Sequence, residues 1–256
     1  MKGMADSTRT TGTDPVKRFS GGFDGRRTIV VGVPQAGSGV PMFSEWPTAF
    51  GEVPFLRYHL PGRDRRRAEP AATSIENLCA DLEESIAALG ARGVESLVLT
   101  GHCMGALVAD AVAARLQDRM RVTTVLSSMR PAKEGLYGAY ASSMSDEEIL
   151  TIMNAALAGS GRPPVHEAFA ALAVRTLRED VGLLSRYFGE GGERDLPRTV
   201  VHWSEDAFVP ASDLDYWRGF AETTVVEADG APEHYLVAGN AAIRRIEELC
   251  AAGERG

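Results

Sequence analysis

The chain has 256 residues, of which 44% are apolar and 24% charged, so its composition is that of a globular protein and excludes a fibre or a wholly disordered chain. Its 35 acidic residues outnumber its 27 lysines and arginines, and the net charge of -8 argues against binding to nucleic acid or to an anionic membrane. Three cysteines, at positions 79, 103 and 250, are too few and too scattered for a disulfide framework or a CxxC zinc site, so no metal is expected and a reducing cytoplasm suits them.

Residues 1–27 predict a loose, flexible N-terminal arm, because they combine basic side chains with serine, threonine and glycine and contain no apolar run of the kind a secretory signal needs. No stretch of about 18 apolar residues follows that would span a membrane. We therefore expect a cytoplasmic protein with one folded domain over residues 28–252.

Six short β-rich runs follow the arm. Several are too uniformly apolar to have one wet face, which favours a covered and mainly parallel sheet. The predicted strands cover residues 28–33, 55–60, 96–100, 122–127, 199–203 and 223–227.

Helical patterns separate these strands. Apolar residues from 75 to 89 lie on one helical stripe that includes Cys79, and Thr73 with Glu76 predicts a capping box at its start. Further helices are expected over residues 106–116 and 241–251. Alternating strands and helices predict an α/β fold.

Residues 140–192 interrupt the alternation with an inserted pair of helices. Ser145 and Glu148 are spaced to cap the first, and the proline-containing turn after Gly159 separates it from the second. Helices inserted at this point are typical of a lid over an active site. The alternative is that the two helices pack on the domain and do not gate a site.

The segment 97–107 predicts a nucleophile at a strand-to-helix turn. A strand runs into Gly101-His-Cys103-Met-Gly105, and a helix begins at once. This is the context of a G-x-S-x-G nucleophile elbow, in which a strained central residue is flanked by glycines. The positive end of the helix dipole would favour a Cys103 thiolate. A buried structural cysteine is the alternative.

An elbow nucleophile needs a base and an orienting carboxylate, in the chain order nucleophile, acid, histidine. Asp206 follows a predicted strand and is preferred to its neighbour Glu205, while His234 lies in a loop after the last strand. His102 directly precedes Cys103, so its side chain should point away from the thiol and support the elbow. An Asx turn at Asp206 and a solvent-exposed His234 are the alternatives. The other histidines fall in strands or in the helical insert: His59, His166 and His202.

With these motifs in place, the chain resembles the type II thioesterases of polyketide and nonribosomal peptide synthesis, from about residue 28 to 250. Asp206 and His234 fall where that family has its aspartate and histidine. The matching segments are Val33-Pro-Gln-Ala-Gly-Ser38 with Phe43 and Trp46, Leu60-Pro-Gly-Arg63 with Glu69, Ser145-Asp-Glu-Glu-Ile-Leu150, and Leu177-Arg-Glu-Asp-Val181.

The resemblance implies an α/β-hydrolase fold, with a mainly parallel central sheet and a helical lid. It implies an enzyme that takes acyl groups from the phosphopantetheine thiol of an acyl or peptidyl carrier protein and has no bound cofactor. Cys103 would attack the carbonyl, His234 would act as base, and Asp206 would fix the tautomer of His234.

The resemblance also implies an oxyanion hole made by the backbone N–H of Met104 and one from the Gln35–Ala36 loop, with about 3 to 4 kcal/mol for each donor. The chain departs from the family at two positions, since serine is usual at Cys103 and an aromatic residue at Gln35. An acyl group on a thiol stays activated, so hydrolysis, aminolysis, esterification and cyclisation all remain open.

Two other classes of function remain open. Cysteine elbows also occur in hydrolases similar to dienelactone hydrolase, which open small lactones without a carrier, although the Leu-Pro-Gly-Arg loop and the long lid argue against them. A non-catalytic protein that binds acyl carriers would dock its partner without acylating Cys103.

A basic cluster follows the Leu60-Pro-Gly-Arg63 loop in this acidic chain. It comprises Arg63, Arg65, Arg66 and Arg67. We predict that it helps to dock a carrier protein, whose surface and phosphopantetheine phosphate are negative, because ligands bind at the carboxyl edge of parallel sheets. A solvated arginine-rich loop is the alternative.

Overall fold

The structure, a computed structural model, describes residues 14–131, 143–187 and 195–253. The described residues form an eight-stranded sheet with the order β1-β4-β2-β5-β6-β7-β8, and β3 pairs with β4 outside this path. The pairs from β4 through β8 are parallel, whereas β1 and β3 each run antiparallel to β4. The expected α/β-hydrolase architecture with a mainly parallel sheet is confirmed.

All six predicted strands are present. They are β2 (Thr28–Val33), β4 (Val53–Tyr58), β5 (Ser96–His102), β6 (Arg121–Ser127), β7 (Arg198–Trp203) and β8 (Thr223–Ala228). The sequence patterns did not predict β1 (Phe19–Ser20) and β3 (Ala49–Phe50), because two residues are too few to show an alternation of apolar and polar side chains.

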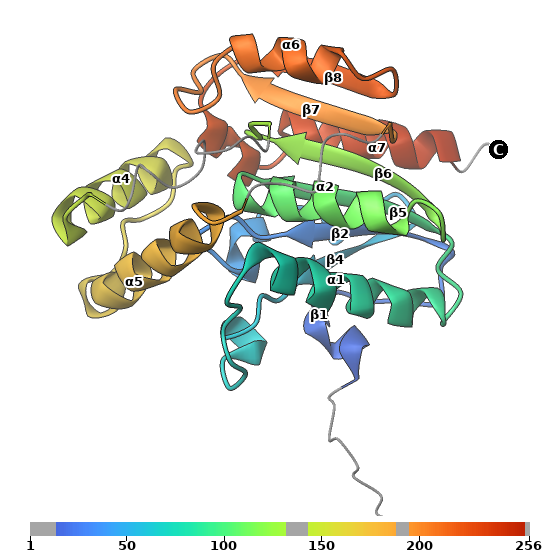
Figure 1. The fold of residues 1–256 in the computed structure, drawn as a ribbon, viewed down its shortest axis with the longest axis horizontal. Helices are drawn as coiled ribbons and strands as arrows, with labels where there is room; N and C mark the ends of the chain where they lie inside the picture. The colour runs from blue at the N-terminus through green and yellow to red at the C-terminus, as the bar shows by residue number, and fades with distance from the viewer. Residues whose placement is uncertain (1–13, 132–142, 188–194, 254–256) are drawn as a thin grey trace, which may run out of the picture.

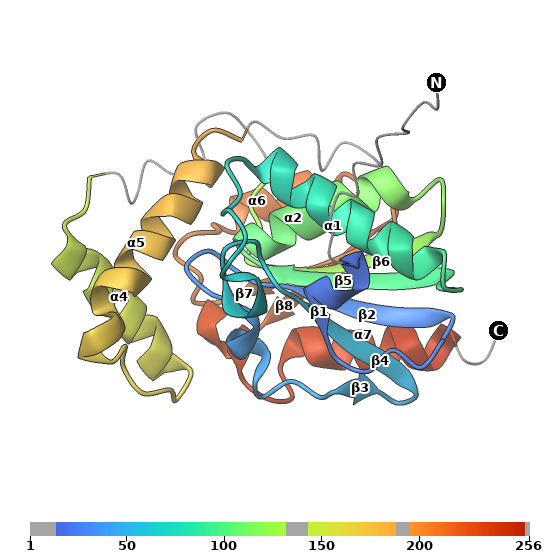
Figure 2. The same ribbon diagram turned by 90° about the horizontal axis from the view of Figure 1, so that it is seen from below.

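Helices cover both faces of the sheet. In Figure 2, α1 (Ile75–Gly90), α2 (Met104–Leu116) and α6 (Ser212–Arg218) lie on one face, and α7 (Ala241–Gly253) lies on the other. Each face has its own apolar core, with Cys79 on the α1 side and Cys250 on the α7 side. A sheet covered on both faces explains why its central strands are nearly continuous apolar runs.

Two local expectations need correction. The N-terminal arm is shorter than residues 1–27, because β1 pairs with β4 and the Phe19 side chain is buried; residues 1–13 lie outside the described part. The N-cap of α1 is Ser74, whose hydroxyl accepts from the Asn77 N–H, and not Thr73 with Glu76. Ser74 is the N-cap because its backbone is extended and it directly precedes the first helical residue.

The inserted helices are α4 (Asp146–Gly159) and α5 (Glu167–Leu184), within the lid predicted over residues 140–192, whose ends fall outside the described residues. Ser145 and Glu148 form the expected capping box of α4. In Figure 1 the two helices lie together beyond the carboxyl ends of the parallel strands. Short 3-10 turns complete the connections: η1 (Pro15–Arg18), η2 (Val40–Phe43), η3 (Asp64–Arg66) and η4 (Pro232–Leu236).

Candidate active site

Cys103 occupies a strained turn between β5 and α2. Its φ of 51° and ψ of -117° are rare for a residue with a side chain. A Cβ on Gly101 would lie 2.2 Å from the Gly105 backbone carbon, and a Cβ on Gly105 would lie 2.2 Å from the Val33 carbonyl oxygen. Both glycines are therefore required by close backbone approach, as a nucleophile elbow demands.

The Cys103 thiol is protonated at neutral pH. Burial is the largest cause that raises its pKa to about 11; the Met104 N–H acts in the opposite direction, and the negative charges of Asp206 and Asp180 act with burial. The expectation that the helix dipole favours a thiolate is therefore wrong for this state of the site, because desolvation outweighs it. Attack by Cys103 needs a base.

Cys103 lines a pocket of about 250 Å³ that is also lined by residues of the inserted helices α4 and α5. Apolar side chains of α4 and α5 form its roof, and Ala36, His102 and Asp206 reach it from the sheet side. Besides Ala36, the apolar residues that line it are Met144, Ile149, Ile152, Ala156, Leu177, Val181, Leu184, Phe208 and Pro232. Such a lining suits an apolar acyl chain attached to a reacting carbonyl.

The loop after β2 supplies the second candidate oxyanion donor. The Ser38 N–H donates to the Gln35 carbonyl oxygen at 3.2 Å, and Gly37 between them has a φ of 71°, a left-handed conformation that glycine adopts freely. The Gln35 N–H faces the Met42 sulfur at 3.3 Å. Within the described residues no hydrogen bond engages the Ala36 N–H, so Ala36 is the better candidate of the two.

Asp206 is buried at the start of the turn after β7, whereas its neighbour Glu205 is exposed. Its Oδ1 accepts the N–H groups of Phe208 and Val209 at 2.9 and 3.1 Å, so the Asx turn does form. Its Oδ2 is buried and has no hydrogen-bond partner within the described residues. This oxygen can still accept an imidazole N–H.

His234 is the one residue of the expected triad that does not line the Cys103 pocket, although its neighbours Pro232 and Glu233 do. Its ring packs edge-on against Trp203 with 6.0 Å between ring centroids, and it covers the backbone of Gly230. It lines a pocket beside Asn240 and α7, and no hydrogen bond joins its side chain to Asp206 or Cys103 in the described part of the chain.

His102 lines the same pocket as Cys103. This differs from the expectation that the His102 side chain points away from the thiol. Its Nδ1 is 3.0 Å from the Ser127 hydroxyl, and its ring stacks on Tyr235, so it also contacts the residues behind the elbow. Burial lowers the pKa of His102 to about 4 and keeps the ring neutral at pH 7. The pocket thus brings together Cys103, Asp206 and a histidine other than the expected one.

The remaining histidines each make one side-chain hydrogen bond, although the buried His59 Nδ1 has no hydrogen-bond partner within the described residues. The His59 ring meets the Ser20 hydroxyl, His202 Nε2 lies 2.9 Å from the Val209 carbonyl oxygen, and His166 caps α5 by accepting the Ala168 N–H.

The basic cluster divides into two pairs. Arg66 is buried and donates to the carboxylates of Asp81 and Glu69, and Arg63 pairs with Asp180 on α5. Their inclusion in a docking surface is corrected, because both guanidinium groups are already engaged inside the fold. Arg65 and Arg67 are exposed and remain available to a partner.

Sequence reasoning missed Asp180 on α5, whose carboxylate is buried against the loop after β2. A signal was present, because Asp180 is three residues after Leu177 and four before Leu184, on the apolar stripe of α5. A carboxylate in such a stripe is buried only with partners.

Among residues 14–131, 143–187 and 195–253, no cluster of three or more histidine, cysteine, aspartate or glutamate side chains could hold a metal. No helix in those ranges is both long and apolar enough to span a membrane.

A known family and several known proteins are similar to this chain over most of its length. The thioesterase domain family matches residues 28–250. AMB antimetabolite synthetase AmbE of Pseudomonas aeruginosa is 28% identical over 235 residues, which cover 88% of this chain but only 10% of that protein. The chain therefore spans about a tenth of the length of this relative.

Solved structures share the fold at lower identity. The RedJ thioesterase of the prodiginine pathway in Streptomyces coelicolor superposes with a TM-score of 0.70 at 24% identity, over 87% of this chain and 84% of that one. The type II thioesterase YbtT of the yersiniabactin pathway gives a TM-score of 0.69 at 21% identity, over 91% and 94%.

Proposed function

This chain belongs to the thioesterase domain family, and we propose that it takes acyl groups from the phosphopantetheine thioester of an acyl or peptidyl carrier protein in polyketide or nonribosomal peptide biosynthesis. One observation carries the proposal: Cys103, on a strained elbow, opens into an apolar pocket under the lid, beside the Ala36 loop. The pathway type rests on what the similar proteins are said to serve.

In the proposed reaction the Cys103 sulfur attacks the thioester carbonyl as its proton passes to His234. The carbonyl electron pair moves onto oxygen, which the N–H groups of Met104 and Ala36 stabilise. Collapse restores the carbonyl and breaks the bond to the pantetheine sulfur, which leaves with the proton from His234. Cys103 then holds the acyl group as a thioester.

The acyl group leaves Cys103 when water or another nucleophile attacks the same carbonyl. Attack by water gives a carboxylic acid, and attack by an amine or alcohol gives an amide or ester. The base role of His234 requires its imidazole to turn from Trp203 toward Asp206 Oδ2, the buried carboxylate oxygen with no partner among the described residues. Asp206 would then fix the tautomer of His234.

Intact-mass analysis after incubation with acyl-pantetheine thioesters, with an acylated carrier protein and with a free lactone tests the proposal. We expect an acyl adduct from both thioester substrates, or released acid where the adduct turns over. Reaction with the lactone alone would favour a hydrolase similar to dienelactone hydrolase. No adduct and no released product from any substrate would contradict an enzymatic function.

A non-catalytic protein that binds acyl carriers is the second candidate. The protonated Cys103, and a His234 that lines a different pocket from Cys103, favour this reading. Such a protein would bind the acylated carrier and leave its thioester intact, which the same mass measurement detects.

For carrier docking we predict that Arg65→Ala with Arg67→Ala lowers kcat/KM for a carrier-bound substrate about 3- to 10-fold at low salt. The loss should shrink as salt rises, because exposed charges act mainly on encounter and are screened over about 10 Å at 0.1 M. Kinetics across a salt series, with a small pantetheine substrate for comparison, measure both effects.

The matched control is Arg119→Ala with Arg121→Ala. These arginines lie near the amino end of β6, at the edge of the sheet opposite the lid. They should leave both substrates unaffected. Equal losses with both substrates, or none with either, would leave Arg65 and Arg67 as parts of a solvated loop.

A further inference from the structure

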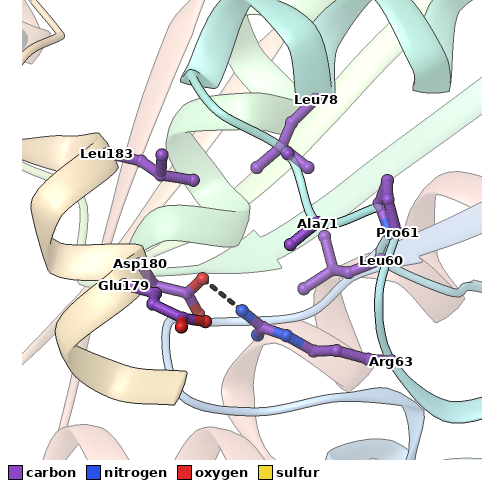
Figure 3. Close-up of a pocket in the computed structure, with 9 residues that line it drawn as sticks. Leu60, Pro61, Arg63, Ala71, Leu78, Glu179, Asp180 and Leu183 are labelled. Carbon is purple, nitrogen blue, oxygen red and sulfur yellow. Dashed lines mark hydrogen bonds and ion pairs between the residues drawn. The ribbon is translucent and has the colours of Figure 1, made fainter. Parts of the chain in front are cut away.

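Asp180 connects the lid to the loop that carries Ala36. Its Oδ2 accepts the Gly37 N–H at 2.7 Å, and its Oδ1 pairs with Arg63. Arg63 also donates to the Ser38 carbonyl oxygen at 2.8 Å. Figure 3 shows Arg63 reaching from its loop to the Asp180 carboxylate on α5. The turn around Gly37 is therefore held on both sides.

The same helix also packs directly on this turn. A Cβ on Gly37 would lie 3.0 and 3.1 Å from two side-chain carbons of Leu177, one helical turn before Asp180. Leu177 and Ala36 both line the Cys103 pocket. The contact between α5 and the loop is thus continuous with the wall of the pocket.

The Asp180 carboxylate is buried, with only 3% of its side chain exposed. A buried carboxylate needs a charge partner and hydrogen bonds, and both of its partners come from outside the lid, on loops near the oxyanion site. The charge of Asp180 also opposes ionisation of Cys103 and so gives the thiol no assistance. Its contacts, in contrast, fix the peptide that follows Ala36.

We propose that Asp180 is a positioning residue that holds the Ala36–Gly37 peptide, and with it the oxyanion donor, in place only while the lid helix α5 is seated. Lid position and transition-state stabilisation are thereby coupled through one carboxylate and its Arg63 partner. The inference rests on the proposed acyl transfer to Cys103.

Asp180→Ala is expected to lower the rate of acylation by an acyl-pantetheine substrate about 10²-fold, as loss of one oxyanion donor does. KM should change less than about 3-fold, because the acyl pocket keeps its lining. Arg63→Gln should give a smaller loss in the same direction, and Asp180→Asn should recover part of the rate, since its amide oxygen can still accept the Gly37 N–H. Glu179→Gln, at the exposed neighbouring acid on α5, is the matched control and should match the wild type.

Two probes separate this role from a general loss of structure. An acyl-chain aldehyde adds to Cys103 as a hemithioacetal: the sulfur–carbon bond forms and the thiol proton ends on the former carbonyl oxygen, which occupies the oxyanion site. Its affinity should fall in parallel with the acylation rate. Iodoacetamide alkylates the thiol by displacing iodide, with no oxyanion formed. Asp180→Ala should leave this rate unchanged or raise it, because a negative charge near the sulfur is removed.

The outcomes are distinct. A wild-type chain that forms no acyl adduct and releases no product contradicts the proposed function, and this inference falls with it. An acylated wild type with Asp180→Ala and Asp180→Asn both at the wild-type rate overturns the inference alone. Equal losses of acylation, aldehyde affinity and alkylation in both variants, with a lowered Tm, would show a structural role only and would also overturn it.

Discussion

Replacing Cys103 with alanine is expected to abolish the acyl adduct and to lower turnover by about 10⁴-fold or more, the scale of loss when a covalent nucleophile is removed. Among the described pockets, the one under the lid contains Cys103, while Cys79 and Cys250 are buried in the two cores on either face of the sheet. Intact mass with peptide mapping of the acylated site measures the effect.

Cys79→Ala and Cys250→Ala are the controls and should keep the adduct at Cys103, with a lower Tm because each removes a buried side chain. Cys103→Ser should form an oxyester in place of the thioester, since the elbow geometry does not depend on sulfur. An adduct that persists in Cys103→Ala would show that Cys103 is not the nucleophile.

The fold could be predicted from the sequence because its signals are local. Each central strand is an apolar run bounded by turns, and the Gly101 and Gly105 spacing marks a strand-to-helix junction where backbones approach closely. The two-residue strands β1 and β3 were not predicted, because they form by pairing with β4 and have no apolar pattern of their own. Ser74 was missed as the helix cap because boundary assignments are uncertain by a residue or two.

The site was predicted less completely, because its properties depend on burial and on contacts distant in sequence. The helix dipole argument for Cys103 ignored desolvation, which raises the pKa of the thiol. Arg63 and Arg66 looked like one run of surface charge, but each has a carboxylate partner more than ten residues away. No sequence pattern predicts the hydrogen bond between the Gly37 N–H and the Asp180 carboxylate, because the two residues are 143 positions apart in the chain.

The position of His234 belongs to the same class of property. Chain order places a histidine after the last strand, but the orientation of its ring depends on the η4 turn and on Trp203. The sequence alone can therefore identify His234 as the candidate base, but it does not predict which pocket the imidazole lines.

Replacing His234 with alanine is expected to lower the acylation rate at pH 7 by about 10³-fold, within the range for loss of a general base. With a pKa of about 11, only about one Cys103 thiol in 10⁴ is ionised at pH 7, so attack without a base is limited by that fraction. Because the folded thiol is protonated below its pKa, the residual rate should rise about tenfold per pH unit between pH 7 and 10. Stopped-flow acylation across this range measures the slope.

Asp206→Asn should lower the rate by up to about 10⁴-fold, because its amide would favour the wrong tautomer of the base. His102→Gln should act mainly on stability, since His102 supports the elbow through Ser127 and Tyr235. The wild type, whose base removes the proton during attack, should show a much shallower pH dependence than His234→Ala.

The contrary result is specific, because His102 already lies in the Cys103 pocket and is neutral at pH 7. If His102→Gln gave the steep pH dependence at an unchanged Tm while His234→Ala kept the wild-type profile, His102 would be the base. His234 would then remain packed against Trp203 during catalysis, as it is in this structure. Loss in both variants, with the steep slope confined to His234→Ala, would instead support a turn of His234 toward Asp206 during the reaction.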